Sequence, residues 1–327
     1  MARKKNIYMV VDTETATLPF ADTIAKNETM KKRVAIARPL VYNIGWSKIY
    51  RSGEVIVSRE FLVAETFSVP SIFNTAYYKE KRPIYLEMLN KGEIQILPWN
   101  DIMEIFLCDL ADVDFVGAYN SMFDYKKAIP FTDLYISKLY SPNYYEWEKT
   151  QYCLCENIAN GRTYESEKEF DGEYFTFRNK EWKMFDIWGM ACEHLLNKNS
   201  YRDMCLNNGL LTNSGEYFKS SAETSYRYLC KQYDFEEAHT ALADVEIECQ
   251  ILVKILSRHA VTVGIQHFPF KMIGCTDEYV LSKSRINKEH VKRVYDAMGA
   301  YVNNLDDSQY ASHIVNKMER LMEEMGF

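Results

Sequence analysis

Long apolar runs are missing from this 327-residue sequence: no stretch approaches the ~20 apolar residues of a membrane-spanning helix. The N-terminus is basic, but only the short apolar run Ile7–Val11 follows it. That run is too short for a signal peptide and lacks the small-residue cleavage pattern. We therefore expect a cytoplasmic protein with no membrane partner.

Paired cysteine motifs are also missing. Eight cysteines are scattered along the chain, and Cys153 and Cys155 form the only close pair. A zinc site of the common kind needs CxxC clusters, which this chain lacks. Reduced thiols in a cytoplasmic protein are the simplest interpretation.

Positive charge is scarce as well: 39 Lys and Arg stand against 46 Asp and Glu, for a formal net charge of −7. Phosphate contacts require Lys and Arg, so a broad basic surface for nucleic acid is excluded, whereas a local groove is not. The segment 21–38 is locally basic, and it is either a source of phosphate contacts or a solvated surface loop. The hydrophobic content of 47% excludes general disorder.

The pattern of apolar residues predicts an α/β fold. Short β-branched runs predict five strands, at residues 7–11, 42–49, 54–63, 114–119 and 183–187. Helical spacing predicts helices within 83–109, interrupted near Pro98, and at 188–196 and 241–256. Three strands in an antiparallel meander, followed by strand–helix units, predict a mixed five-stranded sheet flanked by helices.

Two regions fall outside this minimal pattern. Residues 140–182 read as an insertion carrying a β-ribbon, because Asp171-Gly172 is a hairpin signal. Residues 259–327 read as a helical C-terminal extension, with helices after Asn287 and over 311–325. The main domain is then 1–258. The apolar face of the last helix packs on its own body or on a partner, either a polymerase or a second copy of the chain.

Three acidic segments carry the chemistry. Asp12 and Glu14 follow a buried strand, and residues i and i+2 of an extended chain point to the same side. Asp124 follows a second buried strand by a few residues. His239 and Asp244 are five residues apart, about 140° around a helix axis, so His239 is expected in the loop before the helix that contains Asp244. Each segment alone is an ordinary surface pattern.

Together and in this order, the three segments resemble the DEDD superfamily of 3′–5′ exonucleases. The matching stretches are Val10–Thr15, Val116–Asp124 and His239–Val245. The His-x4-Asp spacing is similar to that of the DEDDh branch, which includes the proofreading subunit of bacterial replicative polymerases, ribonuclease T and oligoribonuclease. The resemblance covers about residues 5–258, apart from the insertion.

The resemblance implies an RNase H-like fold with a two-metal site. Asp12, Glu14, Asp124 and Asp244 would bind two Mg²⁺ or Mn²⁺ ions, and His239 would be the general base. Carboxylate oxygens suit such hard cations, and an imidazole accepts protons near neutral pH.

The family also binds the terminal nucleotide through residues near these motifs. In this chain the candidate positions are Thr15, Asn120, Phe123 and Leu18, with Phe20 as the alternative to Leu18 for the apolar contact. Many relatives have Thr-Gly after the first motif, whereas this chain has Thr15-Ala16, so recognition of the nucleotide is where it departs from them. Leu18 and Phe123 are equally residues for core packing, and Asn120 for fixing a loop.

The expected function is therefore metal-dependent 3′–5′ hydrolysis of single-stranded ends, with DNA favoured over RNA and 5′-nucleotides released. We expect a stand-alone enzyme of phage or bacterial type, or a separate proofreading-type subunit acting in DNA replication. Two alternatives stay open: an exoribonuclease, and a nucleic-acid-binding module that has lost catalysis. The intact set of four carboxylates and one histidine argues against the second.

Overall fold

A computed structural model describes residues 5–162, 172–265, 269–276 and 279. The chain divides into two compact units. The first unit comprises Met1–Ile187 and Glu236–Ile265, and the second comprises Trp188–Phe235 and Gln266–Phe327. The helices expected after Asn287 and over 311–325 lie outside the described residues. The assignment of functions to a domain of residues 1–258 and an extension of residues 259–327 stays a prediction.

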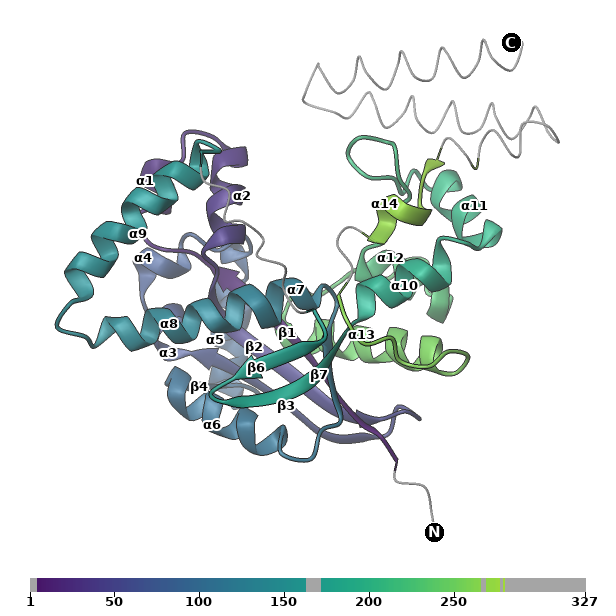
Figure 1. Cartoon of the computed structure of the whole chain (residues 1–327), viewed down its shortest axis with the longest axis horizontal. Helices are drawn as coiled ribbons and strands as arrows, with labels where there is room; N and C mark the ends of the chain where they lie inside the picture. Colours follow the sequence, from purple (N-terminus) through teal and green to yellow (C-terminus); the bar gives the residue numbers. More distant parts are fainter. Residues whose placement is uncertain (1–4, 163–171, 266–268, 277–278, 280–327) are drawn as a thin grey trace. The chain divides into compact units, whose positions relative to one another are not determined.

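The first unit is built on one mixed sheet of seven strands, with the order β4-β3-β2-β1-β5-β7-β6 (Figure 1). β1 pairs antiparallel with β2, and β2 with β3, which confirms the meander. β5 runs parallel to β1 and to β7. The strands are β1 (Ile7–Ala16), β2 (Leu40–Tyr50), β3 (Val55–Val63), β4 (Gln95–Leu97), β5 (Phe115–Ala118), β6 (Tyr174–Phe177) and β7 (Lys180–Asp186).

The prediction of five strands in the sheet was wrong, because the sheet has seven: β4 was missed, and β6 was expected in a β-ribbon outside the sheet. β4 has three residues, too few to show the alternation by which a strand is identified in a sequence. β6 forms a hairpin with β7, and the turn is Arg178-Asn179 instead of the expected Asp171-Gly172. Both turn residues have positive φ, 45° and 64°, as a two-residue type I′ turn requires. The ribbon is therefore part of the sheet.

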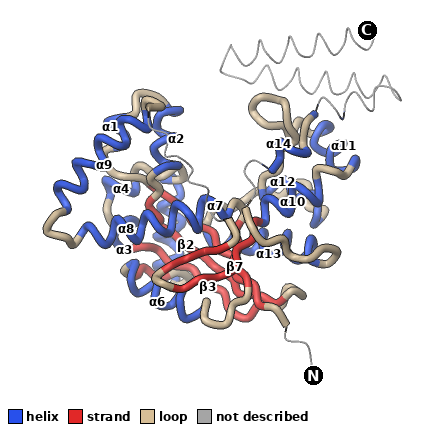
Figure 2. Tube along the Cα trace, viewed as in Figure 1, coloured by secondary structure: helices blue, strands red, loops and turns tan. Residues whose placement is uncertain are grey.

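Helices cover both faces of this sheet, as Figure 2 shows for the first unit. Met9 and Val11 of β1 lie in a core with Trp46 and Phe106, on the face covered by α6 (Trp99–Asp109). Because side chains alternate along a strand, Asp12 and Glu14 belong to the opposite face. α13 (Ala241–Leu256) packs on β1, β2 and β3 there.

The remaining helices of the first unit are short or peripheral. The predicted helical region before β5 is two helices with β4 between them, and the segment 21–38, expected as a possible loop, is helical. The predicted insertion contains one long helix as well as the ribbon. These elements are α1 (Ala21–Ile24), α2 (Glu28–Ala37), α3 (Ala64–Phe67), α4 (Pro70–Phe73), η1 (Lys79–Lys81), α5 (Arg82–Lys91), α7 (Ser121–Phe123), the π-helical turn η2 (Asp124–Ala128), α8 (Ile129–Leu139) and α9 (Tyr144–Ala159).

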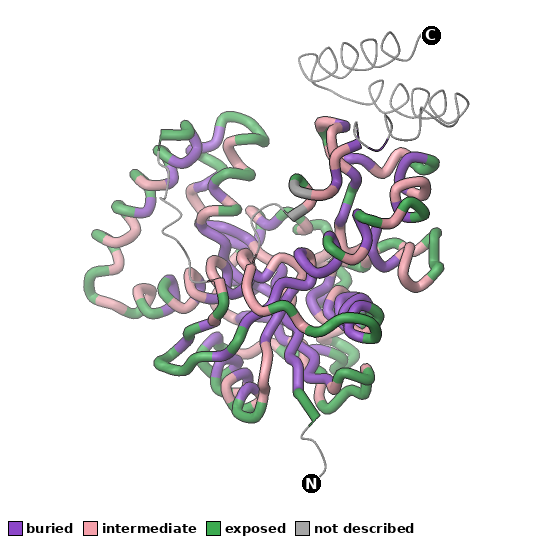
Figure 3. The backbone as a smooth tube through the Cα atoms, turned by 45° about the vertical axis from the view of Figure 1, so that its right-hand side comes forward, coloured by how far each residue is buried: buried purple, intermediate pink, exposed green. Residues whose placement is uncertain are grey.

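The second unit is helical in its described part. It contains α10 (Ile187–Leu195), α11 (Asn199–Asn207), α12 (Ala222–Cys230) and α14 (Pro269–Ile273). Figure 3 shows that the central strands of the first unit are its most completely buried backbone. Among the described residues, no helix has both the length and the apolar character that crossing a bilayer demands.

Candidate metal centre

The two carboxylates of the first motif lie inside a strand. We expected Asp12 and Glu14 at the end of a strand over residues 7–11, but β1 continues to Ala16. The pairing of β1 with β2 shifts between Glu14 and Thr15. Such an irregularity bends a strand locally and re-aims its side chains. Asp12 and Glu14 therefore face α13 from the middle of the sheet, next to this bend.

Asp124 reaches β1 through a hydroxyl group. The Thr13 Oγ1 donates a hydrogen bond of 2.6 Å to Asp124 Oδ1, and both residues are buried. The turn before Asp124 depends on Asn120, whose φ of 84° is left-handed. Asp186 Oδ1 accepts hydrogen bonds from the backbone N–H of Asn120 (3.1 Å) and Ser121 (3.2 Å). Asp186, the last residue of β7, thus fixes the turn that leads into α7.

The third motif occupies the start of α13 as expected. His239 precedes the helix with a left-handed φ of 53°, and Asp244 lies in the first turn. Thr240 is the N-cap residue, but its side chain makes no capping hydrogen bond. Asp244 is placed by the helix, whereas His239 is placed by the loop before it.

Side chains of the sheet satisfy the free N–H groups at the start of α13. Asn43 Oδ1 accepts from Ala241 N at 2.9 Å, and Glu60 Oε1 accepts from Leu242 N at 3.4 Å. Gly45 lies beneath: a Cβ there would be 2.6 Å from Leu242 N. The helix start rests directly on the backbone of β2, and this close approach sets the distance between Asp244 and the carboxylates of β1.

Residues of the first and third motifs meet in one cluster, and Asp124 of the second motif acts on it through its charge. Glu14, His239 and Asp244 each offer a ligand atom, and these atoms all lie within 4.8 Å of one another. His239 Nδ1 is 3.9 Å from Asp244 Oδ2. Asp12 and Asp124 are outside this group of three but interact with it electrostatically: burial, followed by the charge of Asp12, raises the pKa of Asp244.

Like charges and desolvation act on every carboxylate of the cluster. Burial is the largest cause of the raised pKa of Asp12 and of Glu14, and the next cause is Asp124 for the former and Asp12 for the latter. Burial also raises the pKa of Asp124, against the lowering effect of the Thr13 hydroxyl. One oxygen of Asp244, Oδ1, is buried without a hydrogen-bond partner among the described residues. Clustered carboxylates with an unsatisfied oxygen fit divalent cations, which supply the missing charge.

A fifth carboxylate, Glu248, escaped the sequence reasoning. It is 3% exposed, and it accepts a hydrogen bond of 3.1 Å from Tyr119 N. Burial, and then the charges of Asp12 and Asp124, raise its pKa well above the usual value. Its position four residues after Asp244 puts it on the same face of α13, and that spacing was the signal available in the sequence.

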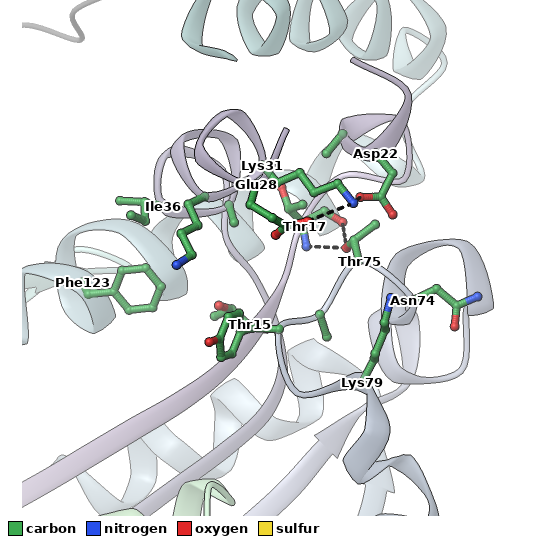
Figure 4. Close-up of a pocket in the computed structure, with 15 residues that line it drawn as sticks. Thr15, Thr17, Asp22, Glu28, Lys31, Ile36, Asn74, Thr75, Lys79 and Phe123 are labelled. Atoms are coloured by element: carbon green, nitrogen blue, oxygen red, sulfur yellow. Dashed lines mark hydrogen bonds and ion pairs between the residues drawn. The ribbon is translucent and has the colours of Figure 1, made fainter. Parts of the chain in front are cut away.

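A cavity of about 450 Å³ is lined by Thr15 and Phe123, which follow Glu14 and precede Asp124 in the sequence (Figure 4). Figure 4 shows Phe123 and Ile36 on one side and Asn74 and Lys79 on the other. Two of the four predicted substrate contacts therefore share one cavity. Asn120 does not line it, and Leu18 is 1% exposed and packs in the core.

Lysines line the same cavity. Lys31 of α2 is 3.3 Å from Asp22 and 3.7 Å from Glu28, so its charge is paired. Lys32 and Lys79 make no ion pair with any residue in the described part of the chain. The basic segment 21–38 thus contributes to the cavity one lysine without an ion pair among the described residues, Lys32. Lys79, from outside that segment, contributes a second.

The acidic cluster gives a prediction for the metal-free protein. Asp124 and Asp244 have pKa values of about 7 and about 8 in the folded state, above the ordinary 3.8. Their contribution to stability is complete below about pH 4 and is lost as pH rises through about 7–8. We expect the metal-free protein to melt at least about 5 °C lower at pH 8.5 than at pH 5.5, since each pKa unit is about 1.4 kcal/mol and each kcal/mol is about 2–4 °C.

Mn²⁺ should offset this loss, so the rise in melting temperature that it causes should be larger at the higher pH. Calorimetry with and without EDTA measures both effects. Asp244→Asn is the matched control, because it removes one titrating carboxyl group and should flatten the pH dependence. A metal-free protein whose melting temperature rises over this pH range would contradict the raised pKa values.

No protein-family model matches the chain, and no curated protein or solved structure matches it. What can be said of its function therefore rests on the described residues and on the three sequence motifs.

Proposed function

We propose that this protein is a metal-dependent 3′–5′ exonuclease of the DEDDh type, with an RNase H-like first unit, acting on single-stranded DNA ends. One observation carries the proposal. Segments spread over more than 200 residues of sequence bring Glu14, His239 and Asp244 within 4.8 Å of one another, and the charges of Asp12 and Asp124 act on this group. The direction of cleavage and the preference for DNA come from the sequence resemblance.

The chemistry follows from the residues present. Asp12, Glu14, Asp124 and Asp244 would hold two divalent cations, which when bound lower the pKa of water and stabilise a leaving oxygen. His239 would accept the proton, and its Nδ1 lies 3.8 Å from Glu237 and 3.9 Å from Asp244. These carboxylates stabilise the imidazolium that forms. Thr13 holds the Asp124 carboxylate in place during the reaction.

The cavity lined by Thr15 and Phe123 supports a strand end as the substrate. Phe123 supplies an apolar surface for a nucleoside, and Lys32 and Lys79 supply charge for its phosphates. These local cations are consistent with a chain of negative net charge that binds nucleic acid in a groove. Binding should therefore weaken as salt concentration rises.

The test uses DNA and RNA strands of the same sequence, each labelled at the 5′ end, with Mg²⁺, Mn²⁺ or EDTA. We expect a ladder of shortened 5′-labelled DNA that depends on the metal, with RNA cut more slowly. Immediate release of the labelled nucleotide would indicate the opposite direction. Faster loss of RNA would favour the exoribonuclease, and no cleavage of either strand with metal present would sink the enzyme assignment.

A further inference from the structure

One short segment connects the cavity to the catalytic histidine. Residues 74–81, between α4 and α5, are called the linker here. Its residues Asn74–Tyr77 and Lys79 line the cavity. Tyr78, which lies between Tyr77 and Lys79 in the sequence, does not line the cavity. Its ring stacks on the imidazole of His239, with ring centroids 4.3 Å apart and planes 13° apart.

A second contact joins the linker to the loop that carries His239. Lys81 Nζ donates a hydrogen bond of 2.7 Å to the backbone oxygen of Ala238. Lys81 also lowers the pKa of both Glu14 and Asp244, so its charge acts on the acidic cluster. The linker thus holds both the ring of His239 and the residue before it.

His239 needs such support for a physical reason. Its φ of 53° is unfavourable for a residue with a side chain and persists only where neighbours hold it. Its side chain is 30% exposed, so core packing alone does not fix the ring. No capping hydrogen bond from Thr240 orders the turn. The ring contact with Tyr78 is the closest aromatic contact of His239 in the described part of the chain.

We propose that Tyr78 is a positioning residue for His239, and that the linker couples occupancy of the cavity to the placement of the imidazole. The proposal rests on the nuclease function proposed above. A nucleotide in the cavity would contact Tyr77 and Lys79, the two neighbours of Tyr78 in the chain. Movement of these residues would be transmitted to the stacked rings of Tyr78 and His239. The imidazole would then reach its position as general base when a strand end is bound.

Four variants of the full-length chain test this by steady-state kinetics on single-stranded DNA. Tyr78→Ala should lower kcat by on the order of 10- to 100-fold, the scale of a small misplacement, with KM nearly unchanged. Tyr78→Phe keeps the ring and should restore kcat. Tyr77→Ala removes a ring that lines the cavity and packs on Tyr78, with centroids 4.8 Å apart, so it should raise KM and also lower kcat. Tyr140→Ala removes a tyrosine that is 74% exposed in the same unit and should change neither constant.

A second measurement is independent of activity. In protein labelled at histidine, the ring resonance of His239 is assigned by its loss in His239→Ala, and stacking on Tyr78 should displace it. Tyr78→Ala should move this resonance and Tyr78→Phe should not. Deoxyadenosine 5′-monophosphate with Mg²⁺ should also move it in the parent protein, and much less in Tyr78→Ala.

The outcomes separate the two proposals. An unchanged kcat together with an unmoved His239 resonance in Tyr78→Ala would overturn the positioning role. A resonance unaffected by the nucleotide in the parent protein would overturn the coupling. A parent protein that cleaves no nucleic acid, yet shows the Tyr78-dependent resonance, would overturn the nuclease function and leave the ring contact standing.

Discussion

Asp12→Asn is expected to abolish cleavage while making the metal-free protein more stable. The two effects have one cause, the position of Asp12 among carboxylates. Burial raises its pKa first, and Asp124 and Glu237 add to the shift. Asparagine has nearly the same shape but brings no charge, so it relieves the repulsion and weakens the binding of both cations. If the proposed two-metal site is correct, we expect a loss of activity below detection, because Asp12 would help to hold both cations.

The gain in stability should be visible in the absence of metal at about pH 8, where the carboxylates are most ionised. Each pKa unit of relief is worth about 1.4 kcal/mol, and each kcal/mol about 2–4 °C in melting temperature. Asp101→Asn is the control, since Asp101 is an exposed residue in the first turn of α6. An Asp12→Asn protein that is inactive and also less stable without metal would show that Asp12 serves mainly the fold.

His239→Ala is expected to slow cleavage by roughly 10²–10⁴-fold, the usual range for losing a general base, while metal binding is largely kept. The geometry also suits a second role for His239, that of a metal ligand. The ligand atoms of His239, Glu14 and Asp244 lie within 4.8 Å of one another, so His239 is also placed to bind a metal itself. The two roles predict different effects of the alanine substitution. If His239 is a general base, the substitution removes the proton acceptor; if His239 is a ligand, it lowers the affinity for the cation.

Calorimetric titration with Mn²⁺ separates these roles. If His239 is a general base, His239→Ala should change the affinity for Mn²⁺ by less than about threefold. Asp12→Asn should weaken the binding of Mn²⁺ strongly. His259→Ala is the matched control, because His259 is an exposed histidine of the same unit. Equal losses of affinity in the His239 and Asp12 variants would show that the histidine is a ligand.

The sequence predicted those strands and helices whose positions follow from local patterns of residues. Short β-branched runs located β1, β2 and β3, and helical spacing located α13 with the observed bounds. It also placed His239 in the loop and Asp244 in the helix, because five residues cannot face one point within a helix. These inferences use local geometry, which the order of residues determines directly.

What the sequence did not reveal depends on contacts between distant residues. The turn Arg178-Asn179 has no glycine, so nothing in its composition signals positive φ. Tyr78 resembles any other tyrosine until the fold brings it to His239, 161 residues away. Leu18 was one of several candidates for the nucleotide contact, and only packing shows it buried in the core.

The close approach of α13 to Gly45 has a consequence for the synthesis of the chain. Asn43 and Ala241, which join the helix to the sheet, are 198 residues apart in sequence. The sheet through β7 can be translated before Asp244 and His239 exist, and contacts of such long separation form late in folding. If the proposed function is correct, a nascent chain carries Asp12, Glu14 and Asp124 without the partners that complete the site. Its ability to degrade nucleic acid would then arise only after Asp244 has left the ribosome.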